Sequence, residues 1–194
     1  MISRLLLLLS TTTAALLVAG LWIPFKAMLA QELLELAWAE SRARQAEVKP
    51  WPWADTWPVA RLSFPGESGS VIVLQGAHGE SLAFGPGWLS GSGSVSEPVV
   101  IAGHRDTHFA RLADLESGTL LQVEHRSGES VSYRVRRSRV VDSRREMIDL
   151  TRLAPGTLML VTCYPFDAVD AGGPLRYVIE AEAEFTTPES VASR

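Results

Sequence analysis

The spacing of hydrophobic and polar residues changes twice along this chain. Residues 5–25 carry no charge and form an apolar run long enough to cross a bilayer. Residues 27–45 are rich in Ala, Leu, Glu, Gln and Arg and lack Gly and Pro, which predicts a helix with Leu29, Leu33 and Leu36 on one face. From residue 59 onward, short apolar runs alternate with turn residues, which predicts strands.

Eight short runs are predicted as strands. The turn Arg126-Ser127-Gly128-Glu129 is typical of a hairpin between the fifth and sixth runs. One or two helical turns are expected within residues 107–115, and a short helix within residues 149–153. The predicted strands are residues 61–64, 71–74, 82–84, 99–102, 120–125, 131–135 (extended by 140–141), 158–162 and 177–183. So many short strands, with little room for helices, predict a mainly β fold that closes into a barrel.

A segment rich in Pro and Trp separates the predicted helix from the strands. Lys49-Pro50-Trp51-Pro52-Trp53 cannot continue a helix, and Trp57-Pro58 follows shortly after. Tryptophans this dense are costly to leave in water, so we interpret the segment as a clamp that packs on the following domain. The expected organisation is an anchor at 1–25, a helical stalk and linker at 26–58, a β-barrel at 59–186 and a polar tail at 187–194.

Composition limits the classes of partner. The chain has 194 residues, with 18 Lys and Arg against 22 Asp and Glu, for a net charge of −4, so nothing indicates nucleic-acid binding. Four arginines cluster on one predicted strand and are interpreted as a solvated face. They are Arg134, Arg136, Arg137 and Arg139.

The charges around the apolar run favour a membrane anchor. Arg4 precedes the run, Lys26 follows it, and Trp22 lies where an interfacial aromatic residue is expected. A cleaved signal peptide is the alternative, but Met28 occupies a position before the candidate cleavage site that prefers a small residue. We therefore expect an uncleaved single-pass helix, with the amino terminus inside and the large polar domain outside.

Three residues of a chemical type suited to catalysis fall at the ends of predicted strands. Cys163 is the only cysteine and follows the run 158–162, His104 follows the run 99–103, and Arg176 opens a later run. A thiol is mostly protonated at neutral pH, and a neighbouring imidazolium and guanidinium would stabilise its reactive thiolate. The pattern suggests a cysteine nucleophile with a base and an anion stabiliser.

Other interpretations of these residues remain open at the level of sequence. A lone cysteine is often a small buried hydrophobe. His104, Asp106 and His108 have the look of a metal cluster, but the glutamate of a zinc-protease helix is missing. There is no phosphate-binding or dinucleotide-binding glycine motif, so no metal and no cofactor are predicted.

Three segments together resemble the sortases, a family of cysteine transpeptidases. The strand ending Leu160-Val161-Thr162-Cys163 is similar to the sortase signature TLxTC. Residues 100–105 (VIAGHR) resemble the segment that carries the sortase histidine, and residues 175–178 (LRYV) the strand that carries the arginine. The resemblance covers residues 59–185. Residues 163–166 and 172–177 look most like sortases of Gram-negative, marine-type proteobacteria.

The resemblance implies an eight-stranded sortase barrel and a transpeptidase. Cys163 would attack a carbonyl in an LPxTG-like signal near the C-terminus of an exported protein, between Thr and Gly. His104 would transfer protons, Arg176 would stabilise the oxyanion, and Thr162 would contact substrate. An amine of unknown identity would accept the acyl group. The domain would face the periplasm from the inner membrane, and the calcium dependence of some relatives is not carried over.

Two rival functions are kept. One is another thiol enzyme of the envelope. An L,D-transpeptidase typically shows a His-Gly-Cys signature, which is absent around Cys163. A cysteine peptidase would need an Asn or Asp to orient its base, and Asp106 is the nearby candidate. The other is an anchored β-domain without catalysis, in which Cys163 is buried and inert. Rapid alkylation of the thiol would distinguish the enzymes from the non-catalytic domain, because a buried thiol would not react.

Overall fold

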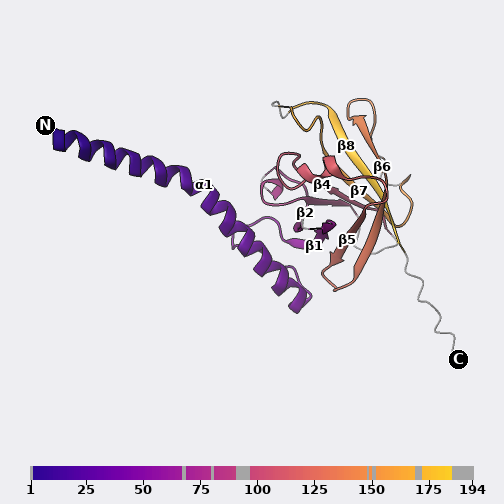
Figure 1. The fold of residues 1–194 in the computed structure, drawn as a ribbon. Helices are drawn as coiled ribbons and strands as arrows, with labels where there is room; N and C mark the ends of the chain where they lie inside the picture. The colour runs from indigo at the N-terminus through magenta and orange to yellow at the C-terminus, as the bar shows by residue number, and fades with distance from the viewer. Residues whose placement is uncertain are drawn as a thin grey trace.

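A computed structural model describes residues 2–66, 69–79, 81–90, 97–147, 149, 152–168 and 172–184. One long helix, α1 (Ile2–Arg44), precedes a β-domain (Figure 1). The helix contains Pro24 and changes direction about half-way along its length, as expected where proline removes a hydrogen bond. Its N-terminal half projects away from the β-domain, and its C-terminal half lies against it.

Eight strands close into a barrel in the order β1-β2-β3-β4-β7-β8-β6-β5, which confirms the predicted fold class. Most neighbours are antiparallel, but β2 with β3 and β4 with β7 are parallel. The strands are β1 (Pro58–Ser63), β2 (Ser70–Gln75), β3 (Gly87–Ser90), β4 (Val99–Ala102), β5 (Leu120–His125), β6 (Ser130–Asp142), β7 (Thr157–Cys163) and β8 (Leu175–Ala183). Two short 3₁₀ helices, η2 (Ser81–Ala83) and η3 (Ala110–Asp114), lie between strands.

Side chains alternate between the barrel interior and its outer surface. Leu158 and Leu160 of β7 point inward to the main core, together with Ile179 and Ala181 of β8. Met159, between the two inward-facing leucines, packs outside the barrel in a second cluster with Val100, Val141 and Val178. Successive residues of these strands therefore face opposite sides of the sheet, and both sides of this part of the sheet are buried.

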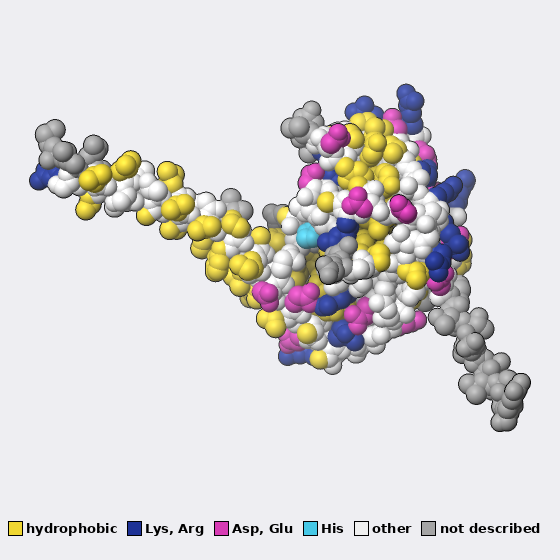
Figure 2. Space-filling view, viewed as in Figure 1, with side chains coloured by type: hydrophobic (Ala, Val, Ile, Leu, Met, Phe, Trp, Pro, Cys, Tyr) yellow, Lys and Arg dark blue, Asp and Glu magenta, His cyan; other side chains and the backbone are white. Residues whose placement is uncertain are grey.

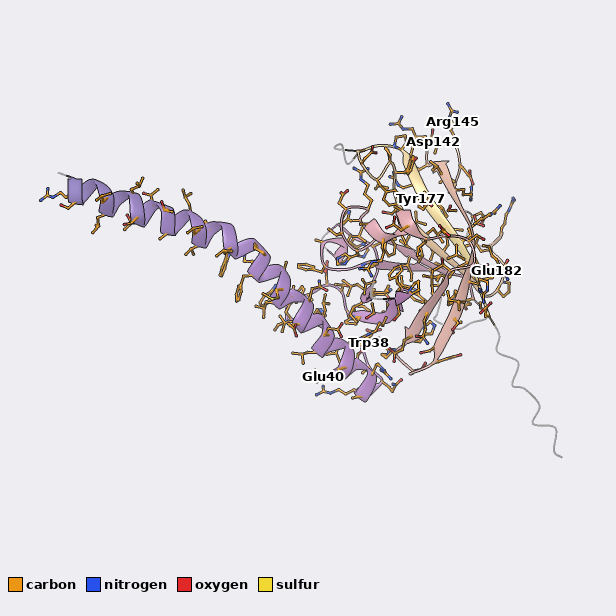
Figure 3. The ribbon with its side chains drawn as sticks, viewed as in Figure 1. Trp38, Glu40, Asp142, Arg145, Tyr177 and Glu182 are labelled. Atoms are coloured by element: carbon orange, nitrogen blue, oxygen red, sulfur yellow. The ribbon has the colours of Figure 1, made fainter. Side chains whose placement is uncertain are left out.

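The C-terminal half of α1 packs on the barrel along a face that differs from the predicted one. Leu34 and Trp38 are buried against Ile72 and Leu74 of β2. Figure 3 shows Trp38 on the side of α1 that faces the barrel and Glu40 on the other side. The predicted face was wrong, because Leu29 and Leu36 are 49% and 65% exposed. The buried positions are Ala30, Leu34, Ala37, Trp38 and Ser41.

The Pro/Trp segment clamps the barrel through only part of its length. Trp51 meets the ring of Phe84 edge to face, with centroids 4.9 Å apart. Trp53 does not pack as expected and is 82% exposed. The expectation of a clamp is correct for Trp51 and wrong for Trp53.

The third predicted strand is displaced along the sequence. Residues 82–84 were expected to be extended, but Ser81–Ala83 form the 3₁₀ helix η2, and the strand is Gly87–Ser90. Gly87 pairs with both Leu74 and Ala102, and a Cβ at this position would lie 2.2 Å from the carbonyl oxygen of Gly76. This glycine therefore permits a strand inside a stretch whose composition indicates a loop.

The remaining local predictions have mixed outcomes. The helical turns expected within residues 107–115 are confirmed by η3, and Val140 and Val141 extend β6 as expected. The helix expected at 149–153 includes residues outside the described part of the chain, and the tail at 187–194 lies wholly outside it.

The arginines of β6 form cross-strand ion pairs with glutamates, chiefly of β8. Arg137 and Arg139 both contact Glu180, and Arg136 contacts Glu182 at 2.7 Å. These side chains lie on the solvated surface, as predicted, and their charges are balanced there.

Candidate active site

Strands β4 and β7 end side by side and bring their C-terminal residues to the same edge of the barrel. The strands are parallel, with Ala102 opposite Val161. The ladder continues one step further, because the amide of Gly103 donates to the carbonyl oxygen of Val161 at 3.1 Å. His104 follows Gly103 and Cys163 follows Thr162, so the histidine and the cysteine both lie at this edge of the barrel.

Strand β8 brings the arginine to the same place. Cys163 is the last residue of β7 and lies directly opposite Arg176 in the antiparallel β7–β8 pair. Directly opposed residues project from the same face of a sheet, with Cβ atoms about 4.5–5.5 Å apart. The structure therefore brings Cys163 and Arg176 together on one face, as their places at strand ends suggested.

Arg176 is partly held by its own loop. Its Nη1 donates to the carbonyl oxygens of Gly173 at 2.7 Å and Leu175 at 2.8 Å. Among the described residues its hydrogen bonds run through Nη1, which leaves the rest of the guanidinium for an incoming group. The backbone supports this arrangement, because the amide of Tyr164 donates to the carbonyl oxygen of Leu175 at 3.1 Å.

Cys163 and Thr162 face opposite sides of the sheet. Cys163 is half-buried on the outer face, whereas the side chain of Thr162 points inward and is 2% exposed. The Thr162 hydroxyl donates to the carbonyl oxygen of Gly103 at 2.8 Å. This bond ties the end of β7 to the residue before His104, so the position of Thr162 favours support of the site over the substrate contact expected from the sequence.

His104 is exposed at the start of a tight turn. Its carbonyl oxygen accepts hydrogen bonds from the amides of Thr107 at 3.4 Å and Phe109 at 3.1 Å. The ring of Phe109 is fully buried beneath the turn, and a Cβ on Gly103 would lie 2.8 Å from it. Only a glycine lets the buried ring pack so close to the backbone that presents His104.

A second histidine lies near the first. His108 is half-buried, and burial lowers its pKa below the ordinary value; the charges of His104 and Arg111 act in the same direction, while a hydrogen bond with the backbone of Ala83 opposes them. The neutral imidazole is therefore favoured at neutral pH. This nearby group adds no positive charge beside His104.

The contacts of Asp106 do not support a metal site formed with His104 and His108. The Asp106 carboxylate pairs with Nε of Arg105 at 3.2 Å. Within the part of the chain that the structure describes, no three His, Cys, Asp or Glu side chains gather where they could share a metal ion.

Sequence reasoning missed two features beside the site. Arg105 is 5% exposed although it lies between exposed neighbours, and its Nη2 donates to the carbonyl oxygen of Ala168, 63 positions away. Three aromatic rings from β8 and the loop after Cys163 also pack together: Tyr164, Phe166 and Tyr177, with centroid separations of 5.2–6.2 Å. Figure 3 shows Tyr177 within β8. The sequence Cys163-Tyr164-Pro165-Phe166 could have indicated this cluster, because two aromatic residues follow the cysteine closely.

Comparisons with known proteins identify relatives of this domain. A family model described as the Sortase domain matches residues 62–184. Sortase D of Bacillus subtilis (strain 168) is 32% identical over 120 residues, which are 61% of this chain and 60% of the relative. The chain thus spans about three fifths of the length of that curated relative.

Solved structures share the fold. Sortase A from Corynebacterium diphtheriae superimposes with a TM-score of 0.56 at 26% identity, covering 71% of this chain and 65% of that one. Sortase C-1 from Actinomyces oris gives a TM-score of 0.55 at 28% identity, covering 66% and 75% of the two chains.

Proposed function

This chain belongs to the sortase family, and from that membership we propose that it is a membrane-anchored cysteine transpeptidase acting on the sorting signal of an exported protein. The observation that carries the proposal is the pairing of Cys163 with Arg176 across β7 and β8, at the edge where β4 delivers His104. A nucleophile, a proton carrier and a permanent cation within one edge are the groups that acyl transfer requires.

The first half of the reaction forms an acyl enzyme. The thiolate of Cys163 attacks the carbonyl carbon of the substrate peptide bond, a C–S bond forms, and the carbonyl electron pair moves to oxygen. Collapse of this tetrahedral intermediate breaks the C–N bond, and the leaving amine takes a proton from the His104 imidazolium. The products are a thioester on Cys163 and a neutral imidazole.

The second half reverses these roles with a new amine. The incoming amine attacks the thioester carbonyl and gives a proton to the His104 imidazole, and the C–S bond breaks to return the thiolate. When water attacks in place of the amine, the product is a carboxylic acid and the net reaction is hydrolysis. Arg176 donates hydrogen bonds to the developing oxyanion in both halves.

The substrate class is inferred from the sequence resemblance. We propose an LPxTG-like signal near the C-terminus of an exported protein, cut between Thr and Gly, with an unidentified amine as the acceptor. The similarity of residues 163–166 and 172–177 to Gram-negative sortases motivates placing the enzyme in an inner membrane with the barrel in the periplasm.

The anchor is assigned to the N-terminal part of α1. The helix from Leu9 to Arg44 is long and apolar enough to cross a membrane by length and composition. Figure 2 shows hydrophobic side chains along the part that projects from the barrel; Leu16, Leu21 and Phe25 are each more than half exposed. Exposed Trp53 borders an apolar crevice with Lys26, where the helix would leave the membrane, and tryptophan and lysine suit such an interface.

The proposed division of the chain follows from these assignments. Residues 1–25 form the anchor, 26–58 the stalk and linker, 59–186 the catalytic barrel, and 187–194 the tail. Because α1 is continuous through residue 26, anchor and stalk would be parts of one helix.

Kinetics of transfer test the roles of the three residues. The full chain in detergent is incubated with an LPxTG-containing peptide and triglycine as acceptor, and the new amide is quantified. We expect no product from Cys163→Ala, a loss of about 10²–10⁴-fold for His104→Ala and about 10²–10³-fold for Arg176→Ala. Arg176→Lys should recover part of the activity, because the ammonium keeps the positive charge and can still donate a hydrogen bond to the oxyanion.

The matched control for Arg176 is Arg145→Ala. Arg145 lies beside the start of β8 but is 87% exposed, and within the described part of the chain its ion pair is the local one with Asp142 (Figure 3). Its removal should leave transfer within about twofold of the wild type, since a surface charge pair contributes little. Equal losses for the two arginine variants would mean that Arg176 acts only through general charge, and the proposed oxyanion role would fail.

A further inference from the structure

A buried charge lies immediately beside the proposed base. Arg105 is 5% exposed, although the adjacent His104 and Asp106 are both exposed. Removing a guanidinium from water is costly unless hydrogen bonds and charges replace the lost hydration. A turn that only needed to leave β4 could have used an apolar residue here, so the contacts of Arg105 require explanation.

These contacts join two segments that are distant in sequence. Nη2 of Arg105 donates to the carbonyl oxygen of Ala168 at 2.6 Å, and Nε pairs with the Asp106 carboxylate at 3.2 Å. Ala168 lies in the loop that follows Cys163 and leads to β8. The Arg105 side chain therefore spans from the turn that presents His104 to the loop that continues from the nucleophile.

Within the described residues, the ladder between β4 and β7 ends before Arg105 and Ala168. The bonds joining the ends of β4 and β7 are the Gly103 amide to Val161 and the Thr162 hydroxyl to Gly103. Beyond them the two segments diverge, one into the turn at 104–109 and the other into the loop at 164–168. Among the hydrogen bonds of the described residues, the one from Arg105 to Ala168 connects the diverging segments.

We propose that Arg105 is a positioning residue for acyl transfer, holding the His104 turn and the loop after Cys163 in fixed relation. The inference rests on the proposed sortase reaction. A displacement of about 1 Å between reacting groups can cost about 10²-fold in rate, so a connection at this level governs the chemical step. Arginine suits the task because its planar fork serves two acceptors in different directions, which lysine cannot do equally well.

Kinetic constants separate positioning from a merely structural role. The full chain in detergent is assayed with the LPxTG-containing peptide and triglycine, about 20 °C below the lowest melting temperature of the set. We expect Arg105→Met, which keeps the length of the side chain without its charge, to lower kcat at least tenfold while KM changes less than threefold. Arg105→Lys should recover part of kcat, because the ammonium keeps the positive charge and can still donate hydrogen bonds from this position.

The control is Val123→Ala. Val123 is fully buried in β5, across the barrel from β4 and β7, so its truncation destabilises the fold without touching the site. We expect this variant to lose thermal stability and to keep kcat within twofold. If Arg105→Met and Val123→Ala lower kcat equally, or if lysine recovers nothing, the positioning role is wrong.

A substrate-free measurement keeps this inference distinct from the proposed function. The rate at which iodoacetamide alkylates Cys163 at pH 7 depends on the groups around the thiol and not on any peptide. We expect Arg105→Met to slow alkylation at least threefold, as His104→Ala should, and Val123→Ala to leave it unchanged. If the wild type transfers no peptide, the proposed function fails, and an unchanged alkylation rate in Arg105→Met would overturn the positioning role separately.

Discussion

At the scale of single residues, one glycine sets how the proposed base is presented. Gly103 ends the β4 ladder, accepts the Thr162 hydroxyl, and lies against the fully buried ring of Phe109. The backbone can approach that ring because no side chain intervenes. The position of His104, the next residue, depends on this close packing.

Gly103→Ala should therefore damage both stability and transfer. A Cβ 2.8 Å from the Phe109 ring must displace it, and overpacking of this kind costs about 1–3 kcal/mol of unfolding free energy. Urea denaturation and transfer kinetics measure the two losses. Gly79→Ala is the control, since a Cβ there meets nothing within 4 Å. Indistinguishable stabilities for the two variants would contradict the packing argument.

A buried histidine on the far side of the barrel makes stability depend on pH. His125 is 6% exposed, its Nε2 lacks a hydrogen-bond partner among the described residues, and burial lowers its pKa from 6.5. Since the folded state disfavours the charged form, stability is fully present above about pH 6.5 and falls as the pH drops below it.

His125→Phe should weaken this dependence. The aromatic ring keeps the edge contact with Trp88 but cannot take up a proton. We expect the free energy of unfolding to fall less between pH 7.5 and 5.0 in the variant than in the wild type, with His108 contributing part of the remaining slope. Urea denaturation at the two pH values measures this change. If the free energy of unfolding falls equally in the variant and the wild type, His125 is not responsible.

At the scale of elements, local sequence patterns predicted most of the barrel. The features that were missed depend on contacts between separate segments of the chain. Runs such as β4 and β7 were found because they are short and continuously apolar, and Cys163, His104 and Arg176 were found because they lie at the ends of such runs. Strand β3 was missed because its identity depends on Gly87 fitting between β2 and β4, a contact that the composition of the segment does not reveal. Arg105 was missed because its acceptor is a backbone carbonyl 63 positions away, which leaves no side-chain signal.

The helix face was mispredicted for a related reason. Leu29 and Leu36 are as hydrophobic as Leu34, and the sequence of an isolated helix cannot tell which of its leucines meets the barrel. Ile72 and Leu74 of β2 decide this, because they provide the surface on which Leu34 and Trp38 are buried.

The outer face of β6 offers a test at the same scale. Arg139 forms ion pairs with both Glu180 and Glu146 and is 31% exposed, whereas Arg136 forms one ion pair among the described residues, with Glu182, and is 53% exposed. Exposed ion pairs contribute about 0–1 kcal/mol each. We expect Arg139→Gln to lower unfolding free energy by about 1 kcal/mol and Arg136→Gln by less than about 0.5 kcal/mol, with the difference shrinking in 1 M NaCl. A larger loss for Arg136→Gln would contradict this ranking.

At the scale of the whole molecule, α1 belongs to two environments. Its N-terminal half projects from the barrel with exposed apolar side chains, whereas Leu34 and Trp38 in its C-terminal half are buried on β2 (Figure 1). Ion pairs from Arg42 to Glu124 and from Glu35 to Arg61 add to this contact. The stalk is therefore part of the folded domain as well as a connection to the proposed anchor.

Truncation measures this contribution. A fragment of residues 27–194 should be soluble and stable, while a fragment of residues 51–194 should lose several kcal/mol of unfolding free energy, since removing a buried Trp alone typically costs about 3–5 kcal/mol. Melting temperatures of the two fragments test this. Trp38→Ala in the longer fragment should reproduce much of the loss, whereas Glu40→Ala, on the side of α1 away from the barrel, should not. Equal melting temperatures for the two fragments would mean that the stalk does not stabilise the barrel.

The most direct test of the central claim is to trap the acyl group on the thiol. The full chain in detergent is mixed with an LPxTG-containing peptide without an acceptor, quenched in acid, and analysed by intact-protein mass spectrometry and peptide mapping. We predict a mass increase equal to the acyl fragment ending at Thr, located on Cys163, absent in Cys163→Ala, and discharged as a new amide when triglycine is added. A wild-type chain that alkylates readily at Cys163 yet never carries the acyl fragment would contradict acyl transfer from this signal.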